Sequence, residues 1–185
     1  MSADTSVSTA EGAAAVAGEV QRKQQHLTTA SQELAAAGQH ADRVIRQAQG
    51  AGLGRVAEGV HEIKRRLEQV THVLGQADGP LASAVTAAAA VTAQTSPKQA
   101  MASLTDATSA ITAAESPIRA AMAQLRQVES WTMQVLDGGN PGPLLDLLGC
   151  ARKSMTAAGN SGLAAKRHAE QTIDRARQVG DSSGN

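Results

Sequence analysis

The chain has almost no aromatic side chains: its 185 residues include one Trp and neither Phe nor Tyr. Aromatic residues normally supply much of a protein core, because each buries roughly 150–250 Å² of surface. About a fifth of the residues are alanine, which is the strongest helix former. Any core must therefore be thin and built from Ala, Val, Leu and Ile. This composition favours slender helices in long lateral contact over a thick globule with a deep cleft.

Cysteine and net charge are also scarce. Cys150 is the single cysteine, which excludes an internal disulfide and a cysteine-based metal site. Because Leu148 and Ala151 flank it, we expect Cys150 to be a small buried hydrophobe. The formal net charge is zero, which argues against a generally basic nucleic-acid binder. No nucleic-acid partner is therefore expected.

No segment has the length and apolar character of a membrane span. The most apolar window, AVTAAAAVTA at residues 84–93, is short and dominated by alanine, whereas a spanning helix needs about 20 mainly apolar residues. The amino-terminal sequence MSADTSVSTAEG has neither the positive region nor the apolar region of a cleaved signal peptide. We therefore expect a soluble protein without membrane insertion that is cytoplasmic, or exported without a cleaved signal.

Apolar residues recur at alternating steps of three and four, the spacing of a narrow helical seam. The clearest run predicts a candidate interaction seam formed by Val56, Val60, Ile63, Leu67, Val70 and Leu74. A similar run precedes it and includes Val44, with Lys23 as its one break, between Val20 and Leu27. Two such helices joined by a short glycine-rich turn favour an antiparallel hairpin.

Glycine, proline and capping signals divide the chain into helices. We predict an all-α fold, an elongated antiparallel bundle of coiled-coil-like helices, as one domain over residues 9–179. Residues 1–8 and 180–185 are expected to be disordered. The dipeptide Ser116-Pro117 could start a new helix or kink a continuing one, and Gly159-Asn160-Ser161-Gly162 is an expected weak point. The expected helices are about 9–49, 54–75, 80–95, 97–136 and 143–179.

Motifs that carry chemistry are absent from the sequence. Glu58 and His61 have the Glu-x-x-His spacing of di-iron bundles, but the required second copy is missing. No P-loop, Rossmann or Gly-x-Ser-x-Gly motif is present. We therefore expect no catalytic residue, no metal and no cofactor, and a protein that is not an enzyme.

Basic residues gather toward the carboxyl end and suggest an alternative role in binding an anionic ligand or surface. Positive charge late in a helix also complements the helix dipole, which is the simpler explanation. Reversing the charge of Arg175 and Arg177 would test the anion-binding alternative, because electrostatic binding weakens steeply with added salt. The candidate anion-binding residues are Arg152, Lys153, Lys166, Arg167, Arg175 and Arg177.

The only aromatic residue lies shortly before the densest turn signal, in the segment VESWTMQVLDGGNPGP. The alanine-rich helices, the missing signal peptide and this glycine-containing elbow resemble the WXG100 proteins, the ESX-type substrates of type VII secretion. That resemblance implies a helical hairpin linked to secretion. The chain departs from the family pattern because Thr132 and Met133 follow Trp131 where Trp-x-Gly is the rule, and because it lacks the Tyr of the export signal.

Together these features predict a helical scaffold or protein–protein interaction module. Its partner would be another protein, or a second copy of the chain, held through the helical seams. We expect Trp131 to cap one end of the core where a helix meets the loop, with its indole N–H near water.

Overall fold

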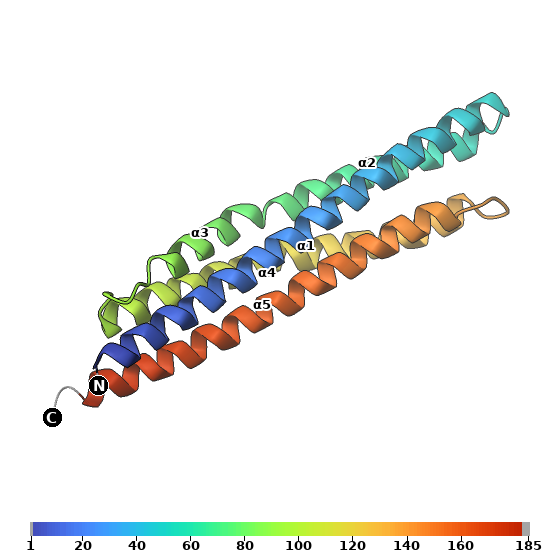
Figure 1. Cartoon of the computed structure of the whole chain (residues 1–185). Coiled ribbons are helices and arrows are strands. Elements are labelled where there is room, and N and C mark those ends of the chain that lie inside the picture. The colour runs from blue at the N-terminus through green and yellow to red at the C-terminus, as the bar shows by residue number, and fades with distance from the viewer. Residues whose placement is uncertain (1, 183–185) are drawn as a thin grey trace. The chain divides into compact units, whose positions relative to one another are not determined.

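A computed structural model describes residues 2–182 of the chain, and side chains from 7 to 178. The chain forms five helices: α1 (Ser2–Gly50), α2 (Gly54–Gly75), α3 (Asp78–Ala89), α4 (Pro97–Val135) and α5 (Gly142–Ser182). No strand occurs between residues 2 and 182. Figure 1 shows the helices in chain order from blue to red. The prediction of an all-α helical bundle is confirmed.

The termini of the helices differ from expectation in three places. Helix α1 begins at Ser2 instead of residue 9, so residues 2–8, expected to be disordered, are helical. Helix α5 ends at Ser182, and the last three residues of the expected disordered tail lie outside the described part of the chain. Helix α3 ends at Ala89 and not at residue 95.

Threonine side chains account for the early end of α3. The Thr95 hydroxyl accepts a hydrogen bond from the Thr92 backbone N–H at 2.8 Å, which offers the backbone an alternative to the helix. Helix α4 then begins with a capping box. The Ser96 N–H donates to Gln99 Oε1 at 3.3 Å and the Gln99 N–H donates to Ser96 Oγ at 3.4 Å. Pro97 occupies the first helical position, where its missing N–H costs nothing.

Two expected interruptions are spanned by continuous helix. Helix α4 runs through Ser116 and Pro117, although Pro117 cannot donate a hydrogen bond to the preceding turn. Helix α5 runs through the glycine-containing stretch 159–162.

The chain forms two compact units, which we describe separately. Unit 1 comprises residues 1–25, 77–116 and 157–185, and unit 2 comprises residues 26–76 and 117–156. Helices α1, α4 and α5 contribute segments to both units, whereas α2 belongs to unit 2 and α3 to unit 1.

Unit 2 contains four helical segments that contact each other in a closed ring. The α1–α2 and α4–α5 turns lie at the same end of this unit, so neighbouring segments run antiparallel (Figure 1). One contact joins each neighbouring pair. The four contacts are Asp42 with Lys64 for α1–α2, Gly59 with Val135 for α2–α4, Glu129 with Arg152 for α4–α5, and Glu33 with Ser154 for α5–α1.

Unit 1 is also built around close contact between helices. A Cβ added to Gly12 of α1 would lie 2.2 Å from the Thr172 hydroxyl of α5, so only glycine lets the two helices meet there. Lys166 of α5 forms an ion pair with Glu115 of α4 at 2.5 Å. Helix α3 buries Leu81, Ala84 and Ala88 in this unit.

Buried positions follow the alternating spacing predicted from the sequence, and many of them are alanine. In α1 the buried residue is Ile45, 4% exposed, where the sequence pattern indicated Val44. The reason is that Ala37, Ala41 and Ile45 follow two successive steps of four, which locally shifts the buried stripe. Helix α5 keeps steps of four and three throughout: Leu144, Leu148, Ala151, Met155, Ala158, Gly162, Ala165, Ala169, Thr172 and Ala176.

Replacement of Leu67 by Ala tests the core of unit 2. Leu67 is 2% exposed, so Leu67→Ala should lower the free energy of unfolding by about 2–5 kcal/mol through lost burial and an unfilled cavity. Urea unfolding followed by far-ultraviolet circular dichroism measures the change. Leu163→Ala is the matched control, because Leu163 is 53% exposed and its truncation should cost little. Equal losses in the two variants would contradict the assignment of the core.

Candidate functional site

The predicted interaction seam lies inside unit 2. Val60, Ile63, Leu67 and Val70 are at most 2% exposed, as is Leu74, and Val56 is half-buried. These side chains contribute to the unit's own core. A partner that bound through this seam would have to displace a helix of the same chain.

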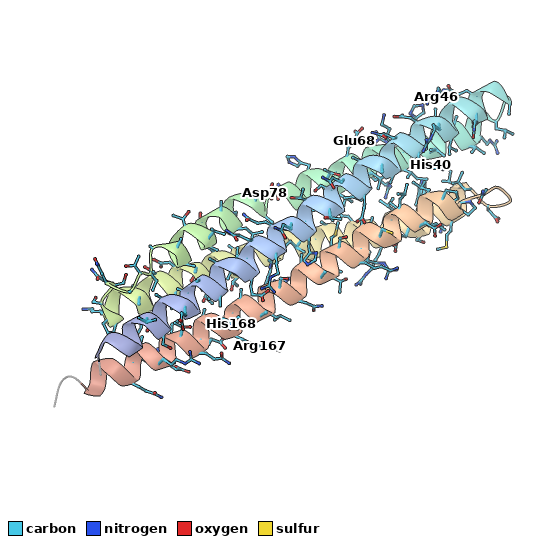
Figure 2. The ribbon with its side chains drawn as sticks, in the orientation of Figure 1. His40, Arg46, Glu68, Asp78, Arg167 and His168 are labelled. Atoms are coloured by element: carbon cyan, nitrogen blue, oxygen red, sulfur yellow. The ribbon has the colours of Figure 1, made fainter. Side chains whose placement is uncertain are left out.

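The six candidate anion-binding residues do not gather at one place within a unit. Arg152 and Lys153 belong to unit 2 and the other four belong to unit 1. Three of the six are engaged in ion pairs: Arg152 with Glu129 at 3.2 Å, Lys166 with Glu115 at 2.5 Å, and Arg177 with Asp174 at 3.5 Å. The remaining three, Lys153, Arg167 and Arg175, are exposed, and Figure 2 labels Arg167 on α5.

Sequence reasoning noted Lys23 only as a break in the seam, but the structure makes it the most unusual charged group that it describes. Its side chain occupies a core position of α1 between Val20 and Leu27 and is 1% exposed. Removing an ammonium group from water is costly unless other groups compensate its charge. A charged residue at a seam position was the available signal.

Two charged side chains from other helices surround the Lys23 amine in unit 1. Burial lowers the pKa of Lys23 below its ordinary value of 10.5, the negative charge of Glu115 opposes that shift, and the positive charge of Lys166 adds to it. Glu115 already pairs with Lys166, so one carboxylate serves two ammonium groups. The cluster therefore carries one positive charge more than it compensates.

A glycine on α5 makes room for the buried lysine. A Cβ added at Gly162 would lie 2.5 Å from Lys23 Nζ, well inside contact distance. By contrast, nothing lies within 4 Å of a Cβ added at Gly159, one turn earlier. Gly162 therefore has a packing role, although the sequence indicated only a weak point in the helix.

The chemistry open to Lys23 is limited by its enclosure. An amine with a lowered pKa beside a carboxylate can act as a nucleophile or a general base where a substrate reaches it. Here the side chain is closed off by α1 and α5, so the geometry supports a role in packing between helices.

The second notable feature is the exposed tryptophan of unit 2. Trp131 is 37% exposed, and the Arg66 guanidinium lies over its ring at 5.2 Å from the centroid, a cation–π arrangement. Arg66 Nε also donates a hydrogen bond to Glu62 Oε1 at 2.7 Å. Trp131 therefore lies on the α2-facing side of α4, four residues before the helix ends at Val135.

Next to this pair, α2 and α4 border a polar groove of about 280 Å³. The Oε1 atom of Gln124 is enclosed in its wall and has no hydrogen-bond donor among the described residues. The groove is lined by Glu62, Arg66, Gln69, Gln124, Gln127 and Val128.

Other expectations concern metals, the single thiol and membranes. Within residues 2–182 no three His, Cys, Asp or Glu side chains are arranged to hold a metal ion. Cys150 is exposed, so its predicted burial is wrong; Leu148 and Ala151 occupy the core positions on either side of it and turn it outward. None of the described helices is both long and apolar enough to cross a bilayer.

Comparison with known proteins gives one match. Residues 95–181, which cover α4 and nearly all of α5, are similar to a family of unknown function, DUF6244. No curated protein and no solved structure matches the chain.

A double-mutant cycle tests the contact between Lys23 and Gly162. Gly162→Ala should destabilise the protein, because the new methyl group meets the ammonium group, although Ala favours helix over Gly by about 1 kcal/mol. In a Lys23→Ala background the same change should stabilise the protein, since the obstructing side chain is gone. Thermal unfolding measures both effects. Gly159→Ala is the control and should be stabilising in either background.

The pH dependence of stability provides a separate test of Lys23. Replacement by Met removes the desolvated charge, so Lys23→Met should be neutral or stabilising, by up to about 4 kcal/mol, at neutral pH. Because the folded pKa is lowered, the unfolded chain binds more protons between the folded pKa and 10.5, and wild-type stability rises with pH across that window. The advantage of Lys23→Met should therefore shrink as pH approaches 10.5. A difference that is independent of pH would contradict the lowered pKa.

Proposed function

We propose that the chain is a non-enzymatic helical scaffold that binds another protein through an outer face of its helices. The observation that carries the proposal is the placement of Trp131. A protein whose core is built from small aliphatic side chains keeps its only aromatic residue at the surface, stacked under Arg66. Trp and Arg are the residue types most enriched among those that dominate binding energy at protein interfaces.

The chemistry of the grooves supports a binding role over a catalytic one. The groove beside Trp131 is lined mainly by glutamines and by the Glu62–Arg66 pair, which offer hydrogen bonds on a helical surface. A larger surface hollow on α2 is bordered by Glu58, His61 and other long charged side chains. Enzyme sites usually combine an apolar pocket with a few convergent polar groups, and these hollows have a different composition.

A link to secretion rests on the resemblance to WXG100 proteins in composition and helical design. Anion binding through α5 is the less favoured alternative, because three of its six basic residues are engaged with carboxylates.

Truncation of the tryptophan tests the proposal. In the cells that naturally make the protein, Trp131→Ala should reduce the yield of covalently cross-linked partner proteins by about tenfold or more, the loss typical of a residue central to an interface. Quantitative mass spectrometry of the cross-linked products measures it. Met133→Ala is the matched control: Met133 is 53% exposed on the same helix and its removal should leave the yield unchanged. Equal yields from wild type and Trp131→Ala would contradict the proposal.

A further inference from the structure

The groove between α2 and α4 contains a hydrogen-bonding group that its own chain leaves unused. Gln124 Oε1 is enclosed and receives no donor from the described residues. An enclosed acceptor without a donor costs about 1–3 kcal/mol, so a donor brought by a binding partner would be favourable there.

Donors and acceptors are both present around that atom. Each glutamine amide of the lining has two N–H donors and one carbonyl acceptor, and Gln69 and Gln127 flank Gln124 in the groove. Arg66 uses its Nε–H on Glu62, and a guanidinium group carries four further N–H donors. The groove can therefore give and accept hydrogen bonds in equal measure.

The charges of the groove are balanced in the same way. Glu62 and Arg66 have opposite signs and lie one turn apart on α2, and the whole chain has a formal net charge of zero. In a two-fold symmetric interface each patch meets itself, so a surface that carries both signs and both hydrogen-bonding roles is complementary to its own copy. No long-range repulsion opposes such an encounter.

We infer that a second copy of this chain docks on the α2–α4 groove of unit 2 in a two-fold arrangement. In that arrangement an amide or guanidinium donor of one copy reaches Gln124 Oε1 of the other, and the two Trp131–Arg66 pairs lie at the edges of the contact. The inference rests on the proposed function and names the partner.

Opposite charges placed at Gln127 test this arrangement in the full-length protein. Gln127 is an exposed groove residue, so Gln127→Glu and Gln127→Arg should leave the fold intact. Two-fold symmetry brings each new charge near its own copy, so each variant should raise the dimer dissociation constant about tenfold. An equimolar mixture of the two variants should restore dimers, because opposite charges then face each other. Light scattering across a concentration series, with sedimentation velocity on the same samples, measures the mass.

The control and the contrary outcomes are distinct. Gln39→Glu places the same charge on an exposed α1 residue in another groove, between α1 and α2, and should dimerise like wild type. A wild-type mass that stays at one chain over the whole series would overturn the inference. Dimers that form equally in wild type and both Gln127 variants would exclude this groove as their site. If the inference fails in either way while Trp131→Ala still loses its cross-linked proteins, the proposed function stands with a different partner.

Discussion

Close approach of helix backbones is the constraint on which this structure depends. A core made largely of alanine provides little burial per residue, so it stabilises the fold only if the helices stay in contact along their length. Gly12 against Thr172 and Gly59 against Val135 show how tight the contact is, because an added Cβ at either glycine would overlap the facing side chain. Small residues are therefore as necessary to this fold as the larger aliphatic ones.

The same constraint determines what the surface can do. Helices packed this closely border shallow grooves, and long polar side chains fill the edges of those grooves. The binding features that remain are few: one tryptophan, the arginine that covers it and a row of glutamines. A function based on contact between proteins suits such a surface better than one based on an enclosed reaction site.

Periodicity and capping residues made much of the fold predictable. The seam from Val60 to Leu74 is buried as its spacing indicated, and α2 spans residues 54–75 as expected. The early end of α3 depends on side-chain hydrogen bonds between Thr92 and Thr95, which compete with the helix in a way that spacing does not reveal. The candidate site was harder to foresee, since the stacking of Arg66 on Trp131 joins residues distant in the chain.

The lysine and glycine pair in unit 1 has a consequence for how the helices find their alignment. Alanines at successive core positions are interchangeable, so α1 could slide along α5 by one heptad and still bury a similar surface. Such a slip would place Lys23 against a position that carries a side chain and would leave the space above Gly162 empty. One bulky cation and one missing methyl group thus work as a lock and key that selects a single axial setting, much as a lone polar residue does in designed coiled coils.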